Sequence, residues 1–253
     1  MNDIVPMERE MLKQVQHYYL GLTDYKTIWD LQRALFQLRL ENSIPDIVLL
    51  NEHHHVYTLG KSSDGDHLLA NEELLKQRGA DVYKIDRGGD VTYHGPGQLV
   101  GYPILNLGNY YADVHRYLRD LEEVIIRTLA EYGIEGRREP DFTGVWVGSE
   151  KIAAIGVKVS HWITMHGFAL NVNTDLSYFD SIIPCGIFHK GVTSMQRLLN
   201  NDIPVKEVSE HIVKKFGEVF GVEIDEIQPE KIKSLMNIKT TENTEWLQAV
   251  KAL

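Results

Sequence analysis

Arg87-Gly-Gly-Asp-Val-Thr-Tyr-His-Gly-Pro-Gly-Gln98 is the stretch from which the fold of this chain can be worked out. The preceding run, 81–86, alternates like a strand, and the following run, 99–105, is apolar and strand-like. The stretch is therefore predicted to be a loop between two strands. This argues against a dinucleotide-binding fingerprint or a P-loop, because both hold phosphate at the N-terminus of a helix.

The four glycines of this loop, which are among 20 in the chain, have two interpretations. They could let the backbone approach a bound group, with Arg87, Thr92, Tyr93 and His94 as the polar groups that the loop carries. They could equally serve turn geometry alone. The loop by itself leaves both interpretations open.

Length, composition and net charge limit the classes of protein to which the chain can belong. A chain of 253 residues, 43% hydrophobic and 25% charged, is long enough for a sizeable core. The net charge of −10 argues against non-specific binding to nucleic acid or to an anionic membrane. The first ten residues lack the apolar core of a signal peptide, and no apolar run approaches a membrane span. We therefore expect a cytoplasmic protein.

Hydrophobic periodicity predicts alternating strands and helices. Strands are expected over 14–22, 46–50, 81–86, 99–105, 144–147, 151–160 and 163–173, and helices over 26–41, 71–78, 113–132 and 206–219. A long connection with little periodicity spans 174–192, and patterning weakens after 222. One α+β domain over 1–253 accounts for this order.

His53, His54 and His55 invite a metal-site interpretation. On a strand, however, neighbouring side chains point to opposite faces, so the three cannot all face one ion. We therefore expect no metal there.

Cys185 is the single cysteine of the chain, which excludes an internal disulfide or a multi-cysteine zinc site. A lone cysteine is commonly a small buried hydrophobic residue. Here Pro184 fixes the local backbone and Gly186 leaves the sulfur approachable, a setting that suits a nucleophile. Both interpretations remain open on the residues alone.

A nucleophilic thiol needs help to ionise at neutral pH, because its ordinary pKa is about 8.5. His94, His166 and Lys151 are the candidate helpers. Lys151 opens an apolar run, 152–155, where partial desolvation would suit it to proton transfer. The alternative is an exposed lysine in a turn.

Four segments together resemble one known family: Val56-Tyr-Thr-Leu-Gly60; Arg87–Gln98; Thr143–Val147 with Lys151–Gly156; and His166–Asn173 with Pro184–Ile187. In their order and spacing the chain resembles the octanoyl-acyl-carrier-protein:protein octanoyltransferases of lipoate biosynthesis, the lipoyl synthesis protein B family. The likeness runs from about residue 19 to about residue 198.

The resemblance implies a fold and a reaction. The fold is the α+β (α/β) catalytic domain of biotin and lipoate protein ligases, a mixed, mainly antiparallel sheet with flanking helices. It would comprise a family core over about 14–200 and a C-terminal helical extension over about 201–253. The reaction is octanoyl transfer from octanoyl-acyl carrier protein to a lysine of apo lipoyl domains, in 2-oxoacid dehydrogenases or the glycine-cleavage H protein. We expect a monomer that uses neither cofactor nor metal and binds neither nucleic acid nor membrane.

The resemblance also assigns residues. The family's nucleophile falls on Cys185, and the lysine that assists it falls on Lys151. The substrate-binding positions are Arg87, Gly88, Gly89, Asp90, Val91, Thr92, Tyr93, His94, Ala154, Ile155, Gly156, Gly167, Phe168 and Ala169. A basic patch using some of Lys84, Arg137, Arg138 and Lys158 is the expected docking surface for the acidic carrier.

The chain differs from the family's usual sequence at two places, and two rival functions are alternatives to octanoyl transfer. Family members often carry Pro-Pro where this chain has His54-His55, and arginine where it has Lys158. The nearer rival is an ATP-dependent lipoate or biotin ligase, which needs no nucleophilic cysteine. The other rival is a non-catalytic acyl-binding protein, against which the presence of both Cys185 and Lys151 argues.

Overall fold

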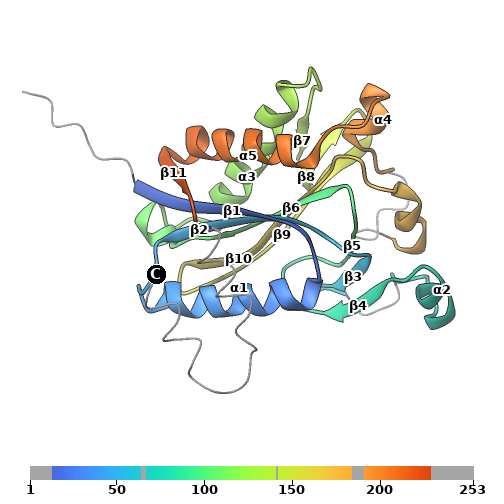
Figure 1. Ribbon diagram of the computed structural model, residues 1–253, viewed down its shortest axis with the longest axis horizontal. Helices are drawn as coiled ribbons and strands as arrows, with labels where there is room; N and C mark the ends of the chain where they lie inside the picture. The colour runs from blue at the N-terminus through green and yellow to red at the C-terminus, as the bar shows by residue number, and fades with distance from the viewer. Residues whose placement is uncertain (1–12, 64–66, 141, 184–190, 229–253) are drawn as a thin grey trace, which may run out of the picture.

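An eight-stranded sheet forms the middle layer of the computed structural model, which describes residues 13–63, 67–140, 142–183 and 191–228 (Figure 1). Its strands lie in the order β11 (Val222–Glu226), β1 (Lys13–Thr23), β2 (Asp46–His53), β6 (Gln98–Ile104), β10 (Ile163–Asn171), β9 (Glu150–Ser160), β8 (Phe142–Val147) and β7 (Arg137–Glu139). β1 is parallel to β11 and to β2, and every other neighbouring pair is antiparallel. The predicted mixed, mainly antiparallel sheet is confirmed.

Helices cover both faces of this sheet (Figure 1). α1 (Tyr25–Leu40) packs on one face, where the buried side chains include Ile28, Leu35 and Val100. α3 (Val114–Ala130) and α5 (Val205–Phe220) cover the other face and contact each other. These are the helices whose apolar residues recur at 3.6-residue spacing, so each buries one stripe against the sheet.

A second, three-stranded sheet has the order β4 (Asp81–Lys84), β3 (Val56–Leu59) and β5 (Val91–His94), with α2 (Glu72–Gln77) beside it (Figure 1). β5 corrects one prediction, since residues 91–94 form a strand inside the expected loop. Val91, Thr92 and Tyr93 favour extended backbone and pair with β3, which confines the glycines to the strand's two ends. The strands that flank the stretch also belong to different sheets, so the stretch joins the two.

The C-terminal part was expected to be a helical extension. Its described residues, up to 228, form α5, which packs against α3, and β11, which pairs with β1 at one edge of the sheet. Residues 229–253 lie outside the described part. The remaining short helices are η1 (Leu107–Asn109), η2 (Leu176–Ser181) and α4 (Met195–Leu199).

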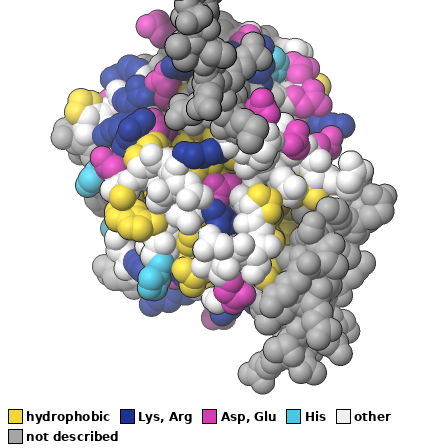
Figure 2. Space-filling model, turned by 90° about the vertical axis from the view of Figure 1, so that its left-hand side faces the viewer, with side chains coloured by type: hydrophobic (Ala, Val, Ile, Leu, Met, Phe, Trp, Pro, Cys, Tyr) yellow, Lys and Arg dark blue, Asp and Glu magenta, His cyan; other side chains and the backbone are white. Residues whose placement is uncertain are grey.

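Charged side chains of both signs cover the surface. On the face shown in Figure 2, Lys and Arg are interspersed with Asp and Glu, and hydrophobic side chains lie between them. Across the described ranges, none of the helices combines the length and the apolar character needed to cross a membrane.

Candidate active site

A cavity of about 460 Å³ is lined by residues of both sheets. One wall is the glycine-rich stretch that follows β4, and the others come from the middle of β9 and of β10. Lys151 and all but one of the predicted substrate-binding residues line this cavity: Arg87, Gly88, Gly89, Asp90, Val91, Thr92, His94, Ala154, Ile155, Gly156, Gly167, Phe168 and Ala169. Segments separated by up to about 80 residues in the sequence thus line one cavity.

Glycines bring the stretch directly onto strand β9. The Gly88 amide donates to the Val157 carbonyl over 2.9 Å. A side chain at Gly156 would begin 3.0 Å from the Gly88 carbonyl oxygen and 3.1 Å from the Arg87 side chain. Gly89 has φ +86°, a conformation that favours glycine. The glycines therefore serve a close approach of backbone to backbone, which shapes the cavity.

Small side chains form part of the cavity wall on the main sheet. Ala169 of β10 pairs with Ala154 of β9, and Gly167 pairs with Gly156 two residues along the strands. Because directly opposed residues in an antiparallel pair face the same way, these four lie on one face. They leave the space that larger residues would fill.

Arg87 is buried at the cavity and is held by β3. Its Nη2 donates to the Thr58 carbonyl oxygen over 2.6 Å and to Thr58 Oγ1 over 2.9 Å. Its charge lowers the pKa of His94 and of His166, although burial is the larger cause at both histidines. The guanidinium is therefore a fixed cation in this wall.

His94 is buried with its Nδ1 2.8 Å from Gln98 Oε1. Gln98 Nε2 donates to the Tyr93 carbonyl and to Asn171 Oδ1, so Gln98 Oε1 is an acceptor and His94 Nδ1 is the protonated nitrogen. Burial lowers the pKa of His94 to about 4. At neutral pH it is an uncharged and weakly basic imidazole, poorly suited to ionising a thiol.

Tyr93 is the predicted residue that the cavity does not include. Alternation along β5 turns it away from Thr92 and His94. Its hydroxyl lies 2.7 Å from His55 Nδ1, and its ring stacks on Tyr178 at 4.7 Å. Tyr93 thus packs the small sheet against η2.

The cavity also includes His166, one of the candidate helpers of the thiol. Several further lining residues were missed by sequence reasoning: Tyr25, Gln98, Val100, Tyr102, Leu118, Phe142, Thr143, Ala153, Val157, Asn171, Phe179 and Val192. Gln98 ends one of the quoted segments and Asn171 lies within another, which was an available signal. Tyr25 begins a helix that the periodicity assigned to the core, and nothing in its local sequence indicates a cavity.

Lys151 is buried, with 9% of its surface exposed, so its interpretation as an exposed turn lysine is wrong. Its Nζ lies 4.8 Å from the centre of the Trp146 ring, a cation–π distance. Its backbone amide donates to the Gly191 carbonyl over 2.9 Å, and its carbonyl accepts from the Thr193 amide over 3.0 Å. Residues that closely follow Cys185 in sequence are therefore fixed beside Lys151. Cys185 itself, within 184–190, lies outside the described residues.

The three adjacent histidines point to different surroundings. His53 is fully buried with Nε2 2.7 Å from the Tyr102 hydroxyl, His54 is exposed, and His55 stacks on Tyr178 at 4.3 Å. Within the described residues, no cluster of three His, Cys, Asp or Glu side chains could hold a metal ion.

The residues of the expected docking patch mostly have carboxylate partners. Arg137 lies 3.0 Å from Glu139, Arg138 lies 2.6 Å from Glu123, and Lys158 lies 2.6 Å from Asp86. Arg137 and Arg138 are on β7, whereas Lys158 is seven residues beyond Lys151 in β9. A docking surface made of these side chains would have to compete with their present ion pairs.

The sequence matches a family model over residues 24–217, that of the lipoyl protein ligase A/B catalytic domain. This chain belongs to that family. An octanoyltransferase from Rubrobacter xylanophilus is 59% identical over 203 residues, covering 79% of this chain and 91% of the relative. One from Christiangramia forsetii is 51% identical over 231 residues, covering 85% and 99%. The resemblance to octanoyltransferases is confirmed, and the chain is an acyltransferase of this group.

The family's fold is confirmed by a solved structure. Lipoate-protein ligase A bound with ATP matches with a TM-score of 0.65 at 15% identity, covering 96% of this chain and all of that one. At this identity the match shows the fold alone. The catalytic residues of the present chain must therefore be argued from its own side chains.

Proposed function

We propose that the protein transfers an octanoyl group from octanoyl-acyl carrier protein to a specific lysine of apo lipoyl domains, through a thioester on Cys185 that Lys151 assists. The observation that carries the proposal is the cavity, whose lining combines the buried Lys151 with small and apolar side chains. Its volume falls in the range of small-ligand sites. The names of the octanoyltransferase relatives support the identity of the acyl group.

In the first step, the Cys185 thiolate attacks the carbonyl carbon of the carrier's thioester. The bond to the carrier sulfur breaks, the carrier thiolate leaves and takes a proton, and an octanoyl thioester remains on Cys185. In the second step, the acceptor's lysine amine attacks that thioester carbonyl. The bond to Cys185 sulfur breaks, an amide forms, and the amine gives up a proton. A thioester is exchanged for an amide, so no ATP is required.

Lys151 would act first as an ammonium beside the thiolate and would give its proton to the departing carrier thiolate. As the resulting neutral amine, it would then accept the proton that the acceptor's amine releases. Two facts support this role. Lys151 lines the cavity from a buried position over Trp146. The segment that contains Cys185 is anchored at both described ends beside cavity residues, because Gly191 bonds to Lys151 and Ile183 bonds to His67, which is paired with Asp90.

The acyl chain would lie along β9 and β10. Ala154 and Ala169 supply its apolar contacts on the face where the Gly156–Gly167 pair leaves room for it. Burial of each methylene would stabilise the complex by about 0.8 kcal/mol. We propose that the donor is a carrier protein in the cytoplasm and that a monomer performs the reaction.

The test is the intact mass of the protein after incubation with octanoyl-acyl carrier protein, without ATP or acceptor. The expected result is a gain of one octanoyl group that neutral hydroxylamine removes and that Cys185→Ala lacks. Alanine is the better control, because a serine could itself be acylated as an oxygen ester. Transfer to an apo lipoyl domain completes the reaction. Labelling that appears only with free octanoate and ATP would instead establish a ligase and overturn the thioester mechanism.

A further inference from the structure

Glu122 is a charged residue of α3 that is fully buried and has no part in the mechanism proposed above. Burying a carboxylate costs a great deal unless the charge is paired and hydrogen-bonded. Glu122 meets both conditions. Oε2 lies 2.7 Å from Arg119 Nη1 and 3.2 Å from Arg138 Nε, and Oε1 accepts a hydrogen bond of 3.0 Å from the Gly144 amide.

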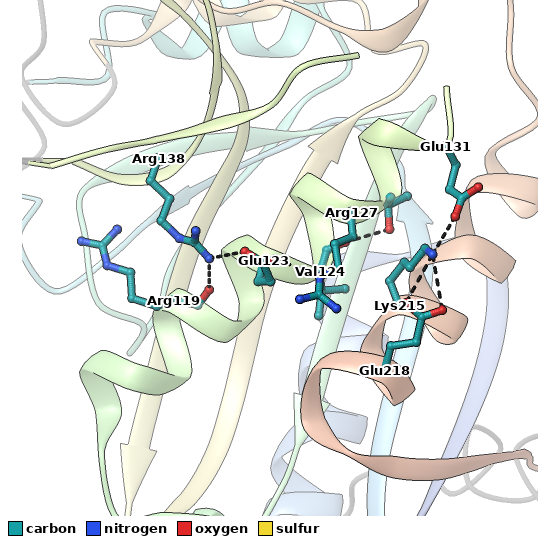
Figure 3. A network of polar contacts seen from close by, with 9 residues as sticks. Arg119, Glu123, Val124, Arg127, Glu131, Arg138, Lys215 and Glu218 are labelled. Atoms are coloured by element: carbon teal, nitrogen blue, oxygen red, sulfur yellow. Dashed lines mark hydrogen bonds and ion pairs between the residues drawn. The ribbon is translucent and has the colours of Figure 1, made fainter. Parts of the chain in front are cut away.

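The two arginines are themselves fixed on this helix. Figure 3 shows Arg138, which comes from β7, reaching α3 and bonding to the Arg119 carbonyl over 3.0 Å and to Glu123 over 2.6 Å. Both guanidinium groups are partly exposed, whereas the Glu122 carboxylate between them has no exposed surface. The arrangement therefore neutralises Glu122 from the solvent side and directs its other oxygen toward β8.

Gly144, the residue that Glu122 holds, lies directly against Lys151. A Cβ atom at Gly144 would be 3.5 Å from Lys151 Cε and 3.6 Å from Lys151 Cδ. It would also be 2.6 Å from the Ala153 carbonyl oxygen, and Gly144 has φ +129°. The β8–β9 ladder is also irregular here, because from Val145–Ala153 to Trp146–Lys151 it advances one residue on β8 and two on β9. The Gly144 amide, next to this irregularity, donates to Glu122.

Trp146 completes the surroundings of the lysine. It pairs with Lys151 across the β8–β9 ladder, and its ring lies 4.8 Å from Lys151 Nζ. Gly144 and Trp146 are two residues apart on β8, on either side of the register shift. Glu122 accepts the Gly144 amide beside that shift.

From these contacts we propose that Glu122 is a positioning residue for Lys151. By holding the Gly144 amide, it keeps β8 where the lysine's stem packs against Gly144 and its ammonium lies over Trp146. The consequence for catalysis rests on the proposed role of Lys151, but the positioning itself does not. The two are therefore measured separately.

The experiment compares two uncharged substitutions of the same length in the full chain. Glu122→Gln keeps an oxygen that can accept the Gly144 amide, and Glu122→Met has none. The reactivity of Lys151 is read from its acetylation rate by acetic anhydride, peptide by peptide, at several pH values. Lys215, whose side chain is 12% exposed on α5, serves as the internal reference for general opening of the fold. Glu123→Gln changes the neighbouring carboxylate of the same network and is the matched control.

The expected result is a Lys151 acetylation rate raised about threefold to tenfold in Glu122→Met, the range for loss of one hydrogen bond. Glu122→Gln and Glu123→Gln should stay near wild type, with Lys215 constant throughout. An unchanged Lys151 rate in a folded Glu122→Met would overturn the proposal. Equal increases in Glu122→Met and Glu122→Gln would also overturn it, because the charge and not the bond to Gly144 would then position the lysine.

If Glu122→Met does not fold, Glu122→Asp takes its place. It keeps the charge between the two arginines and withdraws the oxygen from Gly144 by one methylene. The pH dependence of octanoylation is measured on the same variants. A changed Lys151 acetylation rate with an unchanged octanoylation profile would leave the positioning intact and refute the catalytic role of Lys151.

Discussion

His166 Nε2 lies 2.9 Å from Asp86 Oδ1 and so ties β10 of the main sheet to the segment that follows β4 of the small sheet. His166 has φ +60°, rare for a residue other than glycine, and its own amide donates to Gln32 on α1. The contact joins two walls of the cavity, with Lys158 bound to the same carboxylate over 2.6 Å. The cavity's shape therefore depends on an ionic link between the two sheets.

The contacts of Asp86 with His166 and Lys158 should make the free energy of unfolding depend on pH in the acid range. The hydrogen bond from His166, followed by Lys158, holds the pKa of Asp86 well below its ordinary value of 3.8. A lowered carboxyl pKa contributes stability that is complete above the ordinary value and is lost as pH falls below it. We expect Asp86→Asn to be less stable than wild type at pH 7, with the difference shrinking below about pH 4. Urea unfolding at pH 7, 4 and 3 measures this, and a constant difference would contradict it.

His94 should add a second pH dependence in a different range. Its pKa is lowered to about 4 by burial, so the unfolded chain binds a proton first as pH falls. Its contribution to stability is therefore complete above the ordinary histidine pKa of about 6.5 and falls by roughly 2 kcal/mol between pH 7 and pH 5. His94→Gln cannot titrate and should show a flatter decline over that interval. The urea midpoints of wild type and His94→Gln at pH 7 and pH 5 measure this decline. An identical decline in both proteins would contradict the lowered pKa of His94.

The elements with strong periodicity could be predicted from the sequence. α3 and α5 have a continuous apolar stripe and end close to the expected residues, at Ala130 and Phe220. β5 could not be predicted, because its four residues lie between glycines and their sequence fits a loop equally well. Its strand character comes from pairing with β3, a partner more than 30 residues earlier in the chain.

Part of the cavity lining could be predicted from motifs, whereas the part that only tertiary packing creates could not. Tyr25 and Leu118 reach the cavity from helices whose local sequence indicates nothing but core. Burial of Lys151 could not be predicted either, since it results from Trp146 and from the 191–193 segment packed beside it. Tyr93 shows the reverse error, where a residue in a correct motif faces the opposite side of its strand.

The small residues on β9 and β10 should set the length of acyl chain that the cavity accepts. Ala154 faces the cavity opposite Ala169, so Ala154→Leu would fill space with three further carbons. We expect kcat/KM for octanoyl-carrier to fall about tenfold or more relative to a butanoyl-carrier, the discrimination typical of lost methylene contacts. Steady-state transfer with the two donors measures the ratio. An equal loss for both donors would mean that the variant damages the site in general.

Two glycines of one hairpin should differ in their tolerance of alanine. Gly144 has φ +129° and a Cβ there would lie 2.6 Å from the Ala153 carbonyl, whereas Gly148 has φ +56° and open space around it. Gly148→Ala bears only the cost of the left-handed conformation, about 1–2 kcal/mol. Gly144→Ala adds a backbone clash and should cost clearly more. Thermal unfolding of both variants tests the order, and an equal or smaller loss of stability in Gly144→Ala would contradict it.

Lys151→Met should separate the lysine's charge from its packing. Methionine keeps most of the apolar stem against Gly144 but has no ammonium, so a thiol that depends on that charge would return toward its ordinary pKa of about 8.5. At pH 7 only about 3% of such a thiol is ionised, so single-turnover octanoylation should slow about thirtyfold or more and recover as pH rises toward 9. Lys206→Met, an exposed lysine of α5 that does not line the cavity, is the matched control and should keep the wild-type profile. Rates from intact mass between pH 6 and 9.5 give both profiles.

A Lys151→Met rate that is low at every pH would assign the lysine to proton transfer from the acceptor or to structure. A rate equal to wild type would remove it from the mechanism, because a buried ammonium in the cavity wall would then have no effect on the thiol.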